Sequence, residues 1–519
     1  MYLTQALHRA VQQHPDRTAV RFGERHTSYA AFESRVSRLA AALQGLGLKA
    51  GDRVAMLSHN SDRYLEYQMA VPWAGGVMNP CNSRWSVAEV LYSLEDSGST
   101  ILFVGDAFES MAEEIRDASS TLRDVIYCGD GAVPQGMHSY EDLISRNLPA
   151  PDAMRRGEDL AGIFYTGGTT GFPKGVMLSH SNLCTSALAL HAEALTPEGT
   201  TYLHAAPMFH LADLAATLAL WVGGNTHSVI PSFDPEKVVD AIERDGVTFA
   251  VLVPTMLQML ADSPAMRQPR NLRTLRTVVY SASPMSEALL ERVMRMLPGV
   301  DFVQVYGMTE LAPLATVNPA WTHTPEGRRA GKLRSAGRAA CCVELRIVDD
   351  LGHEVARGEV GEIAVRGPNV MQGYWKQPAM SALAIRDGWM HTGDLAYMDA
   401  DGYVFIADRK KDMIISGGEN IFSAEVENAL SKHPDLVACA VIGIPSEQWG
   451  ESVHAVVVRK PHADVSAEAL VAHCRSMIAG YKCPRSVEFV EALPLSGAGK
   501  VLKAKLREPF WQGSDRQVA

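Results

Sequence analysis

Short runs of branched and aromatic residues alternate with segments of helical apolar spacing along most of the chain. The alternation is clear over residues 28–47, 50–60, 64–82, 87–98 and 99–106. It continues through the segments 235–260 and 275–310, where Val, Ile, Leu and Phe form near-continuous runs. Strands that lack a polar face and alternate with helices are typical of parallel sheets covered by helices. We therefore expect a large α/β region built of layered subdomains.

The pattern changes near residue 330. Residues 343–367 alternate apolar and polar side chains, with Val343, Leu345 and Ile347 on one side of the pattern and an Asp-Asp-Leu-Gly turn after them. A period of two with a turn predicts antiparallel hairpins with one solvated face. We expect a β-barrel-like part here, followed by mixed helix and strand (α+β) up to the end of the chain.

A basic, polar cluster at Arg409–Lys411 interrupts two apolar strands, and we place the domain boundary there. The prediction is a large N-terminal domain over residues 1–408 and a small α+β C-terminal domain over residues 412–519. With 519 residues, the chain is too long for one hydrophobic core, which also favours at least two domains.

Composition and charge exclude several classes of protein. Hydrophobic residues make up 47% and charged residues 21%, as in ordinary globular proteins, and the net charge of −11 disfavours nucleic acid as a partner. No apolar stretch approaches the roughly 20 residues of a transmembrane helix. The eight cysteines include no CxxC pair, which indicates reduced thiols and a cytoplasmic location. Whether the protein forms a homodimer is left open.

The most distinctive stretch is YTGGTTGFPKGV, residues 165–176. Backbone N–H groups and hydroxyls of a Gly/Thr loop after a strand form a cradle for anions, most often phosphate. The loop is not a Walker A motif, because Lys174 follows Pro173 and no Ser or Thr follows the lysine. By itself the loop could equally be a flexible surface turn, so its meaning depends on the rest of the chain.

Further motifs follow in a fixed order. They are APMFH (206–210), SASPMS (281–286), VYGMTE (305–310), HTGDLA (391–396), DRKKDMI (408–414), SGGENI (416–421) and LPLSGAGK (493–500). Together with the Gly/Thr loop, the ordered set covers nearly the whole chain and resembles the adenylate-forming superfamily, within it the AMP-forming acyl-CoA synthetases. The resemblance implies two steps, in which a carboxylic acid reacts with ATP to give an acyl-adenylate and CoA then displaces AMP.

The resemblance also implies which residues handle the phosphates of ATP. The loop residues Thr166, Gly167, Gly168, Thr169, Thr170, Gly171 and Lys174 would wrap the β- and γ-phosphates. Glu310 would hold Mg²⁺, and Thr309 would reach the α-phosphate. Lys500, near the C-terminus, would contact the attacking carboxylate and an α-phosphate oxygen, although a lone lysine in that position is ordinarily a solvated surface group.

For the nucleoside, the resemblance implies that Asp394 accepts hydrogen bonds from both ribose hydroxyls and that Arg409 contacts the same sugar. Ser283, Pro284, Tyr306 and Gly307 would line the adenine slot, with Tyr306 stacking on the base. At Ser283 the sequence departs from the family, which often carries Gly or Ala near this position.

In the second step Lys500 must leave, and members of the superfamily achieve this by rotating the C-terminal domain about a hinge. The resemblance places the hinge at residues 409–411, with Lys411 as the hinge position. Gly417 and Gly418 would leave room for the pantetheine arm of CoA, although SGGEN also fits a simple tight turn. His210 would form a wall or gate of the acyl pocket rather than act as a general base.

The identity of the acid is less clear from the sequence. Residues 211–222 predict a helix with a small, apolar face that suits a hydrophobic acid, medium- or long-chain fatty acid first and aryl or arylpropenoic acid second. Asp213 within this helix either faces solvent or places a polar group near the pocket. Rival functions are an amino-acid adenylation domain, a fatty-acyl-AMP ligase without CoA transfer, a luciferase-like oxygenase and an inactive binding protein.

Overall fold

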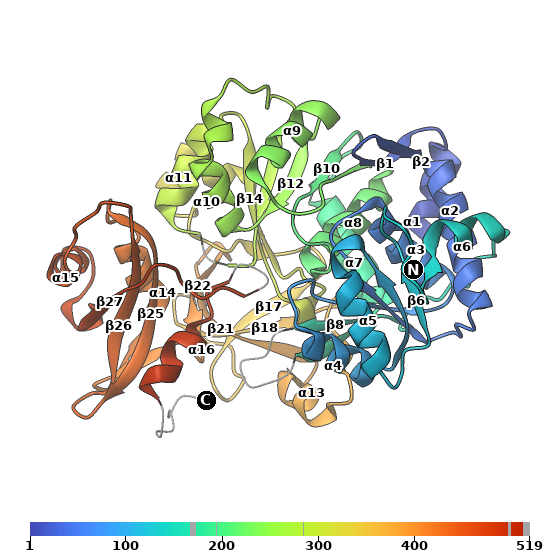
Figure 1. Cartoon of the computed structure of the whole chain (residues 1–519). Coiled ribbons are helices and arrows are strands. Elements are labelled where there is room, and N and C mark those ends of the chain that lie inside the picture. Colours follow the sequence, from blue (N-terminus) through green and yellow to red (C-terminus); the bar gives the residue numbers. More distant parts are fainter. Residues whose placement is uncertain (167–172, 194, 284, 497–499, 512–519) are drawn as a thin grey trace.

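The computed structural model describes residues 1–166, 173–193, 195–283, 285–496 and 500–511. The fold is mixed α/β with a large N-terminal domain and a small C-terminal domain, as the sequence predicts (Figure 1). Two large sheets and their helices form the N-terminal body, a third sheet extends it, and a fourth sheet lies in the C-terminal domain.

The first sheet has nine strands, and its centre is parallel. Its strands are, in spatial order, β16 (Arg338–Ala339), β15 (Thr316–Asn318), β14 (Asp301–Tyr306), β13 (Thr277–Tyr280), β12 (Phe249–Leu252), β10 (Thr201–His204), β11 (Thr226–Val229), β1 (Thr18–Phe22) and β2 (Arg25–Ser28). The central strands β10, β12 and β13 are buried almost throughout, as expected for parallel strands covered on both faces.

The second sheet has eight strands, which are parallel except at one edge. They are, in order, β19 (Gly373–Tyr374), β9 (Lys174–Ser179), β8 (Leu160–Thr166), β4 (Val77–Pro80), β3 (Arg53–Leu57), β5 (Ser99–Val104), β6 (Asp124–Tyr127) and β7 (His138–Ser139). The antiparallel edge formed by β8, β9 and β19 carries the ends of the Gly/Thr loop.

Helices cover the sheets, and side chains at their first turns explain where many begin. Ser28, Ser61 and Ser86 each accept a hydrogen bond from a backbone N–H three residues on, and Asp234 does the same for α9. The helices of the body are α1 (Gln5–Gln13), α2 (Tyr29–Gly45), α3 (Asp62–Trp73), α4 (Val87–Ser97), α5 (Glu109–Ala118), α6 (Tyr140–Arg146), α7 (His180–Ala192), α8 (Leu211–Gly223), α9 (Pro235–Asp245), α10 (Pro254–Asp262), α11 (Glu287–Met296), α12 (Pro325–Arg329) and α13 (Pro378–Ala384). Within the described ranges, no helix is both long and apolar enough to cross a lipid bilayer.

The third sheet confirms the antiparallel hairpins expected after residue 330. It contains β17 (Glu344–Val348), β18 (Gly361–Arg366), β21 (Trp389–Met398), β20 (Ile385–Arg386) and β22 (Val404–Arg409), all paired antiparallel. Glu344 and Arg346 are exposed, whereas Ile347 is buried, so the period of two corresponds to one solvated face.

The C-terminal domain is built on a separate sheet of β24 (Glu419–Ile421), β23 (Ile414–Ser416), β26 (Gly450–Arg459), β25 (Leu436–Ser446) and β27 (Ser486–Phe489). Its helices are α14 (Ser423–Leu430), α15 (Ala467–Arg475) and α16 (Lys503–Arg507). Figure 1 shows this sheet on the opposite side of the molecule from the N-terminus, with α16 next to the body. Arg409 is the last residue of β22, and Lys410 and Lys411 lie between β22 and β23, which begins at Ile414; the boundary at residues 409–411 stays a prediction.

Candidate active site

The Gly/Thr loop joins two antiparallel strands. Thr166 ends β8, Lys174 begins β9, and the two residues face each other across the hairpin. The predicted phosphate-binding residues Gly167, Gly168, Thr169, Thr170 and Gly171 lie outside the described residues. The ammonium group of Lys174 lies 5.4 Å from the centre of the Tyr374 ring. Tyr374 in turn contacts Glu310.

Glu310 is a buried carboxylate at the centre of the site, 7% exposed, in the short 3₁₀ helix Thr309–Leu311. The Tyr374 hydroxyl donates a hydrogen bond of 2.9 Å to Glu310 Oε1. Burial raises the pKa of Glu310, while Tyr374 and the charges of Lys500 and Lys174 act in the opposite direction. The Glu310 carboxylate therefore lies near the cations Lys500 and Lys174. Because it is buried in a region of low dielectric, it would strongly attract a further cation.

Lys500 reaches this site from the C-terminal domain. Its neighbours are held in a small hairpin, in which Ser496 N–H donates to the Lys500 carbonyl and Leu495 pairs with Val501. Burial lowers the pKa of Lys500 to about 8; Arg409 and Lys411 add to this effect, and Asp394 and Glu310 oppose it. The lysine thus lies near charged residues of the body, among them Glu310, which is 190 positions earlier in the chain. Its role in the reaction stays a prediction.

Asp394 and Arg409 face each other across the strands β21 and β22. Arg409 Nε lies 3.4 Å from Asp394 Oδ1, and the Tyr306 hydroxyl donates a hydrogen bond of 2.7 Å to Asp394 Oδ2. The antiparallel pairing of β21 and β22 explains why residues from the consecutive motifs HTGD and DRKK meet at one point. The fold also gives Tyr306 a role that the sequence does not indicate, because its phenol hydroxyl orients the Asp394 carboxylate.

The remaining nucleotide residues lie at the ends of β13 and β14. Ser283 follows β13 and is half-buried, and Pro284 is outside the described residues. Gly307 follows β14, and a Cβ there would lie 1.7 Å from the Pro313 carbonyl oxygen, so only glycine fits. Thr309 is half-buried at the start of the 3₁₀ helix that carries Glu310.

The predicted hinge residue Lys411 and the paired glycines are separated by one strand, β23. Lys411 is half-buried, and burial together with Arg409 lowers its pKa. Gly417 and Gly418 form the two-residue turn between β23 and β24, with φ of +64° and +83°. A turn with positive φ at both central residues favours glycine, so the simple turn expected from SGGEN is confirmed. A role for these glycines in binding CoA stays a prediction.

His210 is the residue before α8, and its carbonyl accepts hydrogen bonds from Asp213 and Leu214 N–H groups. Its ring lies 4.1 Å from the Phe209 ring, centre to centre. Asp213 is fully buried, so the solvent-facing alternative is wrong. Its carboxylate accepts a 2.7 Å hydrogen bond from the Tyr202 hydroxyl and lies 3.0 Å from His204 Nδ1. A buried charge is kept only where such partners exist.

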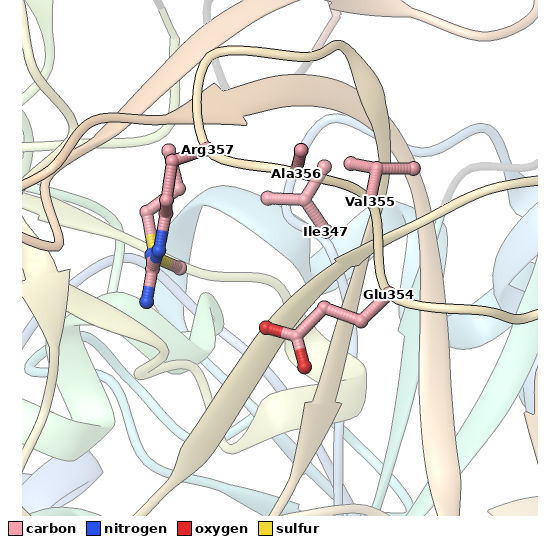
Figure 2. Close-up of a pocket in the computed structure, with 6 residues that line it drawn as sticks. Ile347, Glu354, Val355, Ala356 and Arg357 are labelled. Carbon is pink, nitrogen blue, oxygen red and sulfur yellow. The ribbon is translucent and has the colours of Figure 1, made fainter.

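Two cavities lie away from these residues. One, of about 10 Å³, is a shallow hollow of the third sheet, where Figure 2 shows Arg357 to the left of Ile347 and Glu354 below it. It holds at most about one water molecule. The other, of about 460 Å³, lies between the β1–β2 hairpin and α9. Its lining contains Arg25, Lys237 and Arg244 but also Glu24, Asp130 and Asp240, so it has no single-sign charge to attract an ionic ligand.

Comparison with known families identifies the family to which this chain belongs. Residues 7–375 match the AMP-binding enzyme family, and residues 425–500 match the AMP-binding enzyme C-terminal domain. The chain belongs to the AMP-binding enzyme family. The acyl-CoA synthetase type that the motifs indicate is confirmed, because a feruloyl-CoA synthase and an indoleacetate–CoA ligase match over nearly the full chain.

Three similar proteins illustrate the match. A feruloyl-CoA synthase of Amycolatopsis sp is 40% identical over 503 residues, covering 97% of this chain and 98% of that protein. An indoleacetate–CoA ligase of Aromatoleum aromaticum is 40% identical over 519 residues, covering 98% of each. The crystal structure of ATP-bound MatB from Rhodopseudomonas palustris superposes with a TM-score of 0.88 at 32% identity, covering 99% of each chain.

Sequence reasoning missed Tyr374 of this AMP-binding enzyme, and it named Tyr306 only as an adenine-slot residue. Tyr374 bonds to Glu310 from the short strand β19, and Tyr306 bonds to Asp394 from the end of β14. Tyr374 lies in QGYWKQP, 64 positions after Glu310. No spacing rule connects residues brought together by separate strands, so only the fold reveals the contact of Tyr374 with Glu310, whereas Tyr306 lies in the motif VYGMTE.

Proposed function

We propose that this AMP-binding enzyme joins a compact aromatic carboxylic acid to CoA, with ATP converted to AMP and pyrophosphate. The sequence favoured a fatty acid and placed an aromatic acid second; the order is reversed here. The reversal is supported by two relatives at 40% identity over nearly the whole chain, whose names specify ligases of feruloyl and indoleacetate groups. The fatty-acid preference stays an untested alternative.

The packing of α8 supports a compact acid. Ala212 and Ala216 are one turn apart and share a face of the helix. Ala216 is 3% exposed and packs in one cluster with Val251 and Val279 of the nine-stranded sheet. Ala212, one turn closer to His210, is half-buried. The acid would lie over Ala212 at the carboxyl ends of the strands, and the closed cluster below Ala216 leaves a long chain little depth.

The first step would bring a carboxylate oxygen onto the α-phosphorus of ATP. As this P–O bond forms, the bond from the α-phosphorus to the bridging oxygen of pyrophosphate breaks. Both reactants are anions, so cations must be held where negative charge collects. Lys174 would balance the β- and γ-phosphates and Lys500 the α-phosphate and the acid, while Thr309 would donate to an α-phosphate oxygen.

The residues fit a magnesium ion bound jointly with ATP. Among the described residues, no group of three or more His, Cys, Asp or Glu side chains could hold a metal alone. Mg²⁺ is commonly held by one or two carboxylates together with substrate phosphates, and the buried Glu310 offers such a ligand. Bound there, Mg²⁺ would supply charge neutralisation of the phosphates. Asp394 would take the ribose hydroxyls, with Arg409 on the same sugar and Ser283, Pro284, Tyr306 and Gly307 at the base.

The second step would require Lys500 to leave. The sulfur of CoA, after losing its proton, attacks the acyl carbon, and the bond from that carbon to the AMP oxygen breaks. We place the pivot at residues 409–411 with Lys411 as the hinge residue, and we place Gly417 and Gly418 beside the pantetheine path. His210 would form the gate between that path and the acid.

A pyrophosphate-release screen tests the substrate class. Aromatic acids and fatty acids are compared with and without CoA, and thioester formation is followed by mass spectrometry. We expect the highest kcat/KM with an aromatic acid, and AMP and a CoA thioester as products. Higher kcat/KM with a long-chain fatty acid, or pyrophosphate release without thioester, would overturn the proposal.

A matched pair of acids sharpens the screen. Ala212→Leu should reduce kcat/KM for the preferred aromatic acid while acetate, which does not reach the side chain, retains its low rate. Equal effects on both acids would mean that the acid does not lie over α8.

A further inference from the structure

The loop that carries His210 is fixed by an amide from a different sheet. Residues 205–210 connect the end of β10 at His204 to the start of α8 at Leu211. Asn60 lies in the connection between the strand β3, which belongs to the eight-stranded sheet, and the helix α3. It is 4% exposed.

The hydrogen bonds of the Asn60 side chain go to this loop and to His204, the strand residue that precedes it. Its Nδ2 donates to the His204 carbonyl at 3.3 Å and to the Ala206 carbonyl at 2.9 Å, and its Oδ1 accepts from Met208 N–H at 2.9 Å. A side-chain amide has two donor hydrogens and one acceptor oxygen, so both donors and the acceptor are used within five residues of one loop.

The main chain of Asn60 holds a second loop. Its N–H donates to the Pro231 carbonyl at 3.0 Å, just after β11 ends at Val229. Asn60 therefore ties together the carboxyl ends of β3, β10 and β11. Ligands of open parallel sheets bind in the crevice outside the carboxyl ends of the strands.

We propose that Asn60 is a positioning residue for the acid: its amide fixes the 205–210 loop and, through it, the position of His210 beside Ala212. Asn60 does not touch the reacting atoms. The residues that clamp the nucleotide, Asp394 and Glu310, are held by other elements, so the effect of Asn60 falls on the acid side of the site. The inference rests on the proposed function, because it assumes that His210 and Ala212 border the acid.

The chain supplies a matched control in Asn225. It is 1% exposed, its Nδ2 donates to the Thr196 carbonyl and its Oδ1 accepts from Thr200 N–H, both at 3.1 Å. These contacts lie at the amino ends of the strands β10 and β11, which begin at Thr201 and Thr226. The two asparagines thus perform the same type of clamping at opposite ends of the same strands.

The test compares Asn60→Asp with Asn225→Asp in the full chain. Each variant preserves shape but loses the amide donors, so both should lower the melting temperature by similar amounts. For Asn60→Asp alone, we expect KM for the preferred acid to rise at least about tenfold, a change of ~1.4 kcal/mol, while KM for ATP changes less than about threefold. Equal effects of both variants on KM for the acid would reduce Asn60 to a structural residue and overturn the proposal.

A second readout does not depend on knowing the acid. Hydrogen exchange of the peptide covering residues 204–210 should become faster in Asn60→Ser than in the wild type, and remain unchanged in Asn225→Ser. Unchanged exchange in Asn60→Ser would contradict the clamp, even where Asn60→Asp fails to fold. Wild-type enzyme that is inactive with every acid would instead refute the proposed function. The exchange result would still test whether Asn60 fixes the loop.

Discussion

The interior of the body and the junction between the body and the C-terminal domain are stabilised by different kinds of contact. Within the body, large apolar clusters link the sheets and their helices, and the site residues are fixed by strand pairing, as Asp394 and Arg409 are. The C-terminal domain has its own apolar cluster, from Ile414 to Phe489. Among the described residues, no apolar cluster includes members from both sides of residues 409–411.

The contacts near residues 409–411, the proposed hinge, are polar instead. The Ser423 hydroxyl donates to Asp408 Oδ2 at 2.7 Å, and Lys410 pairs with Asp350 at 2.7 Å. Within the C-terminal domain, Arg507 pairs with Asp412 at 2.8 Å and ties α16 to the segment after the hinge. Polar contacts can be exchanged for water at little net cost, whereas separating apolar surfaces costs free energy in proportion to the area exposed. The difference between apolar packing in the body and polar contacts near residues 409–411 supports the proposal of a rigid site in the body and a C-terminal domain that moves as a lid.

Removing the lid's cation should have the largest effect. Lys500→Ala should slow acyl-adenylate formation by roughly 10²–10³-fold, since a group that stabilises developing charge is lost. Transfer from preformed acyl-AMP to CoA should change little, because the lysine is withdrawn in that step. Pyrophosphate release and thioester formation from synthetic acyl-AMP measure the two steps separately.

Lys505→Ala is the control for that variant, since Lys505 is an exposed lysine on α16. Equal losses in both half-reactions of Lys500→Ala would contradict the idea that the lid serves only the first step.

Altering the body should affect the nucleotide rather than the thiol. Asp394→Ala removes a charged acceptor for two ribose hydroxyls, and hydrogen bonds to charged groups contribute about 1.5–3 kcal/mol each. We expect KM for ATP to rise roughly 10–100-fold and KM for CoA to stay within about twofold. Steady-state kinetics with each substrate varied in turn measures this, and a defect specific to CoA would assign Asp394 to the other half-reaction.

Stiffening the connection should have the opposite outcome to Lys500→Ala. Proline at position 411 fixes φ near −65° and restricts Lys410 as well. Lys411→Pro should slow thioester formation at least about tenfold, or ~1.4 kcal/mol in the barrier, while adenylate formation is largely retained. Lys411→Ala, which keeps the backbone free, is the control. Full overall turnover in Lys411→Pro would remove the hinge from this position.

The smallest effect concerns pH. The pKa of Lys500 is lowered to about 8, so the lysine is charged below that pH and neutral above it. Because the cation is the active form, kcat/KM for adenylate formation should fall as pH rises through about 8. Bound phosphates favour the charged form, so the decline in kcat should begin at higher pH. Lys500→Arg keeps its charge over this range and should lack the decline; the same decline in that variant would assign it to another group.

The sequence predicted the parts of this comparison that depend on local pattern. Continuous apolar runs indicated the parallel strands β5 and β12, and the alternation around Ile347 indicated the hairpin of the third sheet. The motifs also named residues that the fold brings together, including Lys500 with Glu310 and Asp394 with Arg409. Their roles in the reaction are proposals, since proximity alone does not establish them.

Residues that act through contacts between distant segments could not be predicted. Asn60 serves a loop about 145 positions later, and nothing in LSHNSDR distinguishes its amide from that of a surface asparagine. Asp213 was left between two alternatives, because its partners Tyr202 and His204 lie on a neighbouring strand. Such contacts are set by the packing of sheets and helices, which local periodicity does not encode.

A crystal structure with AMP and the preferred acid tests the central claim most directly, namely that the lid brings Lys500 to a nucleotide clamped in the body. The account predicts ribose hydroxyls within hydrogen-bond distance of Asp394, and Lys500 Nζ against the α-phosphate. A nucleotide bound away from both Asp394 and Glu310 would contradict it.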